Sequence, residues 1–122
     1  MASKKMNISG LQQAIERDSV VLYFAPWCGF CKKFEPVYHE VSKKSQKLNS
    51  NVNVVRFNMD KHNKEVQDNN IGVNLFGTNV SQDVKGFPTV IMYKKDGQRS
   101  LYKGPRTEES LLATIAAYYR QN

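Results

Sequence analysis

The sequence is poor in cysteine, with only two among 122 residues, and it has no long apolar run. A membrane-spanning helix needs about 18 or more consecutive apolar residues, so we expect no membrane span. The basic residues near the start, within Met1–Met6, are not followed by an apolar stretch, which argues against a secretory signal. Without such a signal, two cysteines favour a reducing environment, in the cytoplasm or another signal-less compartment.

Composition excludes a disordered chain and indicates one globular domain over residues 1–122, which we expect to be a monomer. Apolar residues make up 40% of the sequence and charged residues 24%. The net charge is +7, but no basic stripe alternates with exposed aromatics and no nucleic-acid motif occurs, so nucleic acid is not expected as a partner. A solvated helix face explains the lysines that follow the cysteines better than a patch for an acidic partner does: Lys32, Lys33, Lys43, Lys44 and Lys47.

Both cysteines, Cys28 and Cys31, lie directly after an apolar stretch at 20–24 that is typical of a buried strand. They are three positions apart, so they share one face of the first turn of the helix that they open. The unpaired N–H groups and the positive dipole end of a helix favour thiolate over thiol. Cysteines in such positions have pKa values lowered from about 8.5 to roughly 3.5–7.5.

A purely structural role or a metal-binding role fits this cysteine pair less well. A disulfide that closes a four-residue loop stabilises a fold by only about 2 kcal/mol, less any strain. A zinc site needs four ligands, and the remaining candidates, His39 and His62, lie far from each other in sequence without ligand spacing. Two inert buried thiols would not need the tryptophan, glycine and helix start that surround them. Redox chemistry is therefore the favoured interpretation, and no metal is expected.

Four segments together resemble the thioredoxin superfamily, most closely the catalytic domains of protein disulfide isomerases. Residues 25–32 (Ala-Pro-Trp-Cys-Gly-Phe-Cys-Lys) resemble the active-site motif, and Pro36 matches the proline that kinks the long active-site helix. Lys85–Thr89 is similar to the cis-proline segment of the family. Gly104–Thr107 resembles an isomerase-type loop before the last helix. These matches follow the family's order over most of the chain.

The resemblance implies an α/β, thioredoxin-like fold with a central mixed sheet of four to five strands. The residue pattern predicts strands at 7–8, 20–24, 52–59, 90–93 and 99–102. It predicts helices at 10–17 with Ser9 as N-cap, at 28–48, at 61–68 and after the N-cap Thr107. The long helix should turn one apolar stripe inward: Phe34, Val37, Tyr38, Val41 and Leu48. Helices are expected on both faces of the sheet.

Residues 69–81 make a longer connection before the cis-proline segment than the family usually has. Asparagine and glycine predict a loop there. Its apolar members indicate that it packs on the domain: Ile71, Val73, Leu75 and Phe76. A peripheral addition is the favoured interpretation, and a substrate contact near the cysteines is the alternative.

The position of the cysteines predicts their roles in thiol–disulfide exchange. Cys28, first in the pair and expected nearest solvent, should be the nucleophile. Cys31, one turn inward, should resolve the mixed disulfide that Cys28 forms with a substrate. Gly29 has no side chain to block the approach, and no cofactor beyond this redox-active disulfide is expected.

The resemblance also implies where a substrate binds. In the family, the proline matched by Pro88 is cis and faces the disulfide. The residue before it, here Phe87, offers backbone hydrogen bonds to an extended substrate in the manner of strand addition. Trp27 would flank the sulfurs as a flat apolar wall. The alternatives are an ordinary proline at the start of a strand and a tryptophan that only fills the core.

Three positions bear on the charge around the pair. Phe30 stands where isomerases usually have histidine and common thioredoxins have proline. Because phenylalanine supplies no charge, we expect a less oxidising couple, in the reducing half of the family's range of about −270 to −120 mV. Leu22 replaces the buried acid that helps relatives to deprotonate the resolving cysteine. Arg106 matches an arginine that swings toward that cysteine; a solvated loop arginine is its alternative.

The sequence thus predicts a thiol–disulfide oxidoreductase that acts on protein thiols and disulfides, with reduction as the favoured direction. An unidentified redox partner would recharge the pair. A disulfide oxidase or isomerase is one alternative, and a redox-inactive binding module with the same fold is another. A glutaredoxin is not favoured, because its Thr-Val-Pro segment and later Gly-Gly pair are absent.

Overall fold

A computed structural model describes residues 4–73 and 77–120 of the chain. Its centre is a five-stranded sheet with the strand order β1-β3-β2-β4-β5. The strands are β1 (Lys4–Lys5), β2 (Ser19–Phe24), β3 (Asn53–Asn58), β4 (Thr89–Tyr93) and β5 (Arg99–Leu101). β1, β3 and β2 run parallel, while β4 is antiparallel to both β2 and β5. The predicted mixed sheet and thioredoxin-like fold are confirmed.

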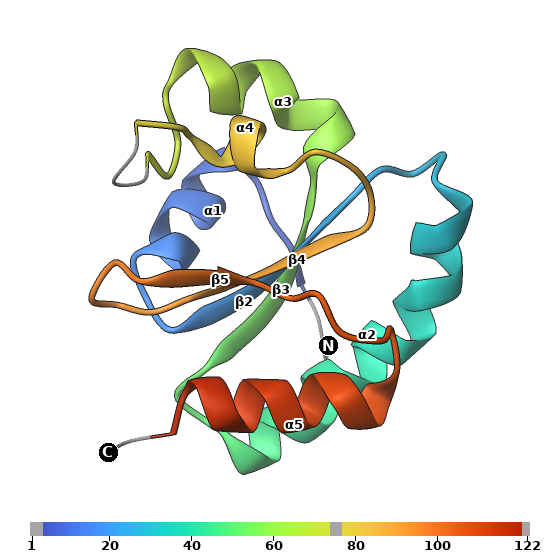
Figure 1. The fold of residues 1–122 in the computed structure, drawn as a ribbon. Coiled ribbons are helices and arrows are strands. Elements are labelled where there is room, and N and C mark those ends of the chain that lie inside the picture. Colours follow the sequence, from blue (N-terminus) through green and yellow to red (C-terminus); the bar gives the residue numbers. More distant parts are fainter. Residues whose placement is uncertain (1–3, 74–76, 121–122) are drawn as a thin grey trace.

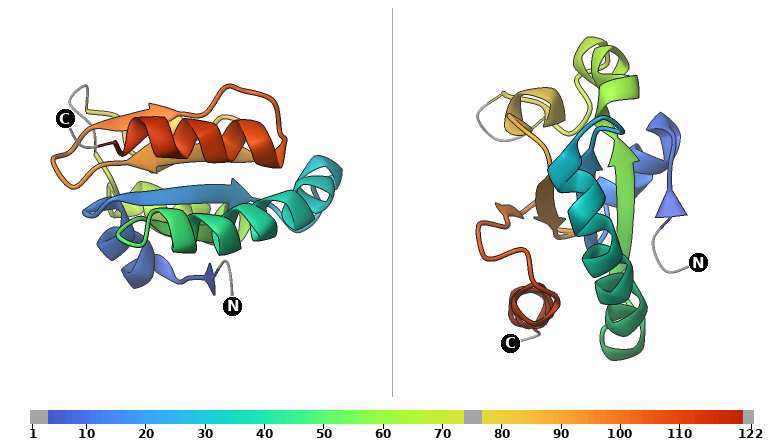
Figure 2. Two further views of the ribbon diagram at one scale, coloured as in Figure 1. Left: turned by 90° about the horizontal axis from the view of Figure 1, so that it is seen from below. Right: turned by 90° about the vertical axis from the view of Figure 1, so that its right-hand side faces the viewer.

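Helices cover both faces of this sheet (Figures 1 and 2). They are α1 (Ile8–Ile15), α2 (Gly29–Leu48), α3 (Met59–Asp68), α4 (Val80–Asp83) and α5 (Glu108–Tyr118). One core cluster joins the sheet to α1, α3 and α4, and a second joins its other face to α2 and α5. Strand β2 contributes to both clusters, with Val21 and Tyr23 in the first and Val20 and Leu22 in the second. It is the central, doubly covered strand that its apolar run predicts.

The hydroxyl groups of two tyrosines connect α2 and the end of α5 to the sheet. The Tyr38 hydroxyl of α2 lies 3.1 Å from the Val20 carbonyl and 2.6 Å from the Val55 carbonyl, so it bridges β2 and β3. The Tyr119 hydroxyl, just after α5, likewise bridges the Ser19 and Tyr93 carbonyls at 2.9 and 2.8 Å. Burial raises the pKa of both phenols, which therefore remain neutral hydrogen-bond donors.

The start of the chain differs from the prediction. The expected strand at 7–8 is wrong, because β1 lies at Lys4–Lys5 and α1 already begins at Ile8. Asn7, rather than Ser9, is the N-cap: its side-chain oxygen accepts a hydrogen bond of 2.9 Å from the Gly10 N–H. Asparagine and serine are comparable N-caps, so sequence alone did not separate the two positions.

Helix α2 matches its predicted span, and the inward stripe holds through Phe34, Tyr38 and Val41, but not at Leu48, which is 71% exposed. A helix of 20 residues is about 30 Å long. A strand of six residues, such as β2, spans only about 20 Å. The last turn of α2 therefore extends beyond the sheet that it covers.

The connection before β4 is more structured than a loop. Ile71 is buried at 2% exposure, and the segment ends in α4, a short helix that the sequence pattern did not predict. Asn79 and Gln82 form a capping box at its start. Val73 is 49% exposed, and Leu75 and Phe76 lie outside the described residues. In Figure 1 the described part of this connection lies on the opposite side of the molecule from the start of α2.

Candidate functional site

The cysteine pair lies at the junction between β2 and α2. β2 ends at Phe24, and Cys28 is the N-cap residue of α2. The Cys31 N–H donates a hydrogen bond of 3.1 Å to Cys28 Sγ, so the sulfur takes the place that a serine or asparagine oxygen usually has at an N-cap. The Cys28 sulfur therefore lies at the first turn of α2, the end of a helix that carries partial positive charge.

Both cysteines are buried in a small apolar cluster. Cys28 is 6% exposed and Cys31 5%, and Ala25 completes the cluster, against which Phe24 and Phe87 pack. The sequence predicts that Cys28 lies nearer solvent, yet the exposed fractions do not separate the two residues. What distinguishes them is the hydrogen bond between the Cys31 N–H and the Cys28 sulfur.

The pKa of the Cys31 thiol is raised to about 11. Burial is the main cause, and a hydrogen bond to the Cys28 side chain acts in the same direction. A hydrogen bond from the Ala25 backbone and the positive charge of Arg106 lower this pKa without outweighing burial. Cys31 is therefore a thiol near neutral pH and must lose its proton before it can act as a nucleophile.

The Phe87–Pro88 peptide bond is cis, as the resemblance implies, and its segment lies beside the cysteines. The Trp27 ring meets the Phe87 ring edge to face, with their centres 5.9 Å apart. Trp27 is 66% exposed, so it is not a core residue. The backbone N–H and C=O of Phe87 form no hydrogen bond with any residue in the described part of the chain, which leaves them open to an extended peptide.

On another side of the pair, Phe30 is 64% exposed and lies under Arg106. The guanidinium carbon is 5.7 Å from the ring centre, which is within the range of a cation–π contact. The structure thus brings Arg106, which is 75 positions beyond Cys31 in sequence, close enough for its charge to act on that thiol.

Tyr102 shapes the loop that carries Arg106, and sequence reasoning missed it. Its hydroxyl bonds to the Pro105 carbonyl and, at 2.7 Å, to Ser110 Oγ. A Cβ at Gly104 would lie 2.7 Å from that hydroxyl and 2.9 Å from the ring carbon that bears it. The glycine of the Gly104–Thr107 segment is therefore required by close packing against this ring.

Leu22, at the position where the resemblance implies a buried acid, is 2% exposed within the second core cluster. Its register partner on β3 is Arg56, whose guanidinium pairs with Glu35 Oε1 at 3.3 Å. Arg56 also lies 5.7 Å from the centre of the Phe24 ring. Sequence reasoning did not single out this ion pair, although Glu35 follows Cys31 by one helical turn.

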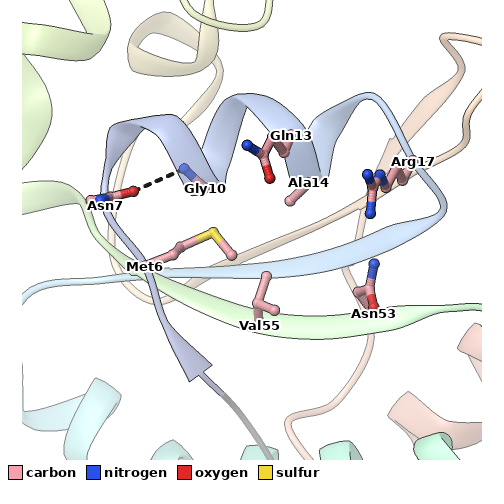
Figure 3. Close-up of a pocket in the computed structure, with 8 residues that line it drawn as sticks. All are labelled: Met6, Asn7, Gly10, Gln13, Ala14, Arg17, Asn53 and Val55. Atoms are coloured by element: carbon pink, nitrogen blue, oxygen red, sulfur yellow. Dashed lines mark hydrogen bonds between the residues drawn. The ribbon is translucent and has the colours of Figure 1, made fainter.

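None of the predicted site residues lines the hollow between α1 and β3 (Figure 3), which measures about 330 Å³. Within residues 4–73 and 77–120, no cluster of three or more His, Cys, Asp or Glu side chains is arranged to hold a metal ion. Over the same residues, no helix is both long and apolar enough to cross a bilayer.

Comparison with known proteins agrees with this geometry. The thioredoxin family model matches residues 5–117. The chain is 33% identical over 95 residues to a protein disulfide-isomerase of Medicago sativa, covering 76% of this chain and 16% of the relative. It is 31% identical over 102 residues to protein disulfide-isomerase of Saccharomyces cerevisiae, and this match covers 82% of this chain and 17% of the relative.

Solved structures show the same fold. The J-Trx1 fragment of ERdj5 superposes with a TM-score of 0.76 at 16% identity, over 96% of this chain and 50% of the other. The first thioredoxin domain of mouse protein disulfide-isomerase A4 gives a TM-score of 0.72 at 23% identity, and the superposition covers 95% of this chain and 74% of the other.

The site and fold define a thioredoxin-type domain with a Cys-x-x-Cys pair at a helix start. The chain belongs to the thioredoxin family, and relatives of it are domains of protein disulfide isomerases. The matched region is less than a quarter of the length of those relatives.

Proposed function

We propose that this domain is a thiol–disulfide oxidoreductase that reduces disulfide bonds in proteins through Cys28 and Cys31. The observation that carries the proposal is the inequality of the two sulfurs. Cys28 Sγ accepts an N–H hydrogen bond at the start of α2, whereas burial keeps Cys31 protonated with a pKa of about 11. One sulfur is thus prepared to attack, and the other holds its proton until the second step.

In the first step, the Cys28 thiolate attacks one sulfur of a substrate disulfide. The substrate S–S bond breaks, a bond forms between Cys28 and that sulfur, and the other substrate sulfur leaves as a thiolate that takes up a proton. In the second step, Cys31 loses its proton and attacks Cys28, which releases the second substrate thiol. Two electrons pass from the cysteine pair to the substrate, and a Cys28–Cys31 disulfide remains. A dithiol reductant would restore it.

Binding is assigned to the surface around the pair. The open backbone groups of Phe87, next to the cis Pro88, would pair with an extended substrate segment. Trp27 would cover the apolar side of that segment, and Gly29 leaves the approach to Cys28 open because nothing lies within 4 Å of where its Cβ would be.

Reduction of insulin by dithiothreitol, followed by turbidity, tests this function. The wild-type domain should accelerate precipitation, Cys28→Ser should abolish the acceleration, and Cys31→Ser should accumulate a mixed disulfide. A wild-type protein with no effect would instead support a binding module that retains the fold.

A disulfide oxidase or isomerase is the second candidate, favoured by the Gly104–Thr107 loop and by the relatives named protein disulfide-isomerase. Equilibration of the pair with glutathione buffers separates the two directions. A midpoint in the reducing half of the family's range, which spans about −270 to −120 mV, supports a reductase, and one near −180 mV or above supports an oxidase or isomerase.

A further inference from the structure

The loops that border the cysteine pair carry positive charge only. They comprise residues 25–33, of which 29–33 form the start of α2, together with residues 85–88 and 102–107. Contacts join these segments: Phe87 packs on the cysteine cluster, and Arg106 lies over Phe30. None of the three loops contains aspartate or glutamate. Their basic residues, which we call the basic rim, are Lys32, Lys33, Lys85, Lys103 and Arg106.

The basic rim is not neutralised by the rest of the domain. No residue of the rim forms an ion pair within the described part of the chain. Of the acids that follow these segments in sequence, Glu35 pairs with Arg56 and Glu108 with Lys44, whereas Glu109 forms no ion pair within the described residues. Elsewhere on the surface, basic residues such as Lys43 and Lys64 do have acidic partners. Lys47, Lys61 and Lys95 likewise form no ion pair within the described residues, so the basic rim is distinguished by the absence of any acidic residue from its three segments.

An apolar surface lies beside the cysteine pair. Trp27 and Phe30 are 66% and 64% exposed, and Phe87 is in edge contact with Trp27. Exposed aromatic side chains are enriched at the centres of protein interfaces, where they supply contact area at low entropic cost. Charged residues around an interface accelerate association with an oppositely charged partner and disfavour partners of the same charge.

We propose that the basic rim selects substrate proteins whose reactive disulfide lies in an extended segment with aspartate or glutamate on both sides of the cysteine. This inference rests on the proposed function and adds a substrate class to it. The apolar side chains next to the substrate sulfur would lie on the aromatic surface, and the acids would face the lysines. The preference would act on the association step and would weaken with salt.

Disulfide-linked dimers of one peptide test the proposal. The peptide has a single central cysteine, and the two residues on each side of it are Asp, Asn or Lys in three otherwise identical versions. At low salt, kcat/KM for reduction by the wild-type domain should be about tenfold higher for the Asp version than for the Asn version, and lowest for the Lys version. The three values should converge as ionic strength approaches about 1 M.

A pair of matched variants locates the effect. Lys85→Glu with Lys103→Glu changes the rim, and Lys61→Glu with Lys95→Glu makes the same change in net charge at exposed positions on α3 and in the β4–β5 turn. The rim variant should lose or invert the preference for the Asp version, while the control variant should keep it. An equal loss in both variants would assign the preference to net charge and would overturn the proposal.

The outcomes distinguish the proposed substrate preference from the proposed reductase function. If the wild-type domain reduces all three versions at equal rates, the substrate preference is wrong and the reductase function stands. If it reduces none of them, including the neutral version, both are wrong. Because the peptide comparison uses the wild-type protein, it does not depend on the folding of any variant.

Discussion

The guanidinium group of Arg106 lies over the ring of Phe30, with 5.7 Å between the guanidinium carbon and the ring centre. Phe30 occupies the position between the two cysteines and brings no charge of its own. The Phe30 ring nevertheless contacts the positively charged Arg106 side chain beside the cysteine pair, and this charge lowers the pKa of Cys31. The aromatic ring therefore positions a cation that another loop provides.

Arg106→Gln should slow the release of substrate from the mixed disulfide more than it slows the first attack. Without the arginine the pKa of Cys31 rises further, so less of it is thiolate at neutral pH. We expect a decrease of about three- to tenfold in the second step, since one pKa unit corresponds to a factor of ten. Stopped-flow measurement of both steps checks this, with Arg106→Lys as the charge-conserving control. Equal rates for wild type and Arg106→Gln in both steps would contradict it.

The second step should also depend steeply on pH. The pKa of Cys31 is raised to about 11, so its thiolate fraction is small at pH 7 and grows with pH up to that value. The rate of resolution in single turnover should increase about tenfold per pH unit above neutrality. Quenched-flow trapping of the mixed disulfide between pH 6 and 10 measures it. A flat profile would show that another group removes the Cys31 proton.

Tyr38→Phe should destabilise the domain by about 1–3 kcal/mol. The variant removes a buried hydroxyl and leaves the carbonyls of Val20 and Val55, on neighbouring strands, without that partner. Urea unfolding followed by circular dichroism gives the change in free energy. Tyr118→Phe is the matched control, because that hydroxyl forms no hydrogen bond within the described residues and its loss should cost less than about 0.5 kcal/mol. Equal effects of the two variants would show that the hydroxyl of Tyr38 does not stabilise the domain by bridging β2 and β3.

Gly104→Ala should disturb the loop that carries Arg106. The new Cβ would lie 2.7 Å from the Tyr102 hydroxyl, which cannot move without losing its bonds to Pro105 and Ser110. Overpacking of this kind costs about 1–3 kcal/mol. Thermal unfolding measures the loss, and the rate of the second step should fall as it does in Arg106→Gln. Gly86→Ala, which meets nothing within 4 Å, should be close to neutral for stability. A neutral Gly104→Ala would disprove the packing argument.

Much of the fold could be predicted because its signals are local. The apolar run of β2 indicated a central strand, and the Cys-x-x-Cys motif correctly predicted a helix start directly after it. The dipeptide Asp96-Gly97 is typical of a hairpin turn, and it lies between β4 and β5, where Gly97 has a φ of +97°. Where two local signals were equivalent, as with Asn7 and Ser9 at the start of α1, prediction chose the wrong one.

The sequence by itself determined the family, most of the strand and helix order, and the position of the two cysteines at a helix start, because each depends on residues that are close in the chain. Only the tertiary structure decided how those sulfurs are surrounded. Phe87 packed on the two cysteines, Arg106 over Phe30, and Arg56 paired with Glu35 are contacts that join segments distant in sequence. Burial and electrostatic interaction depend on distance in space, and that distance is set by the packing of the helices on the sheet.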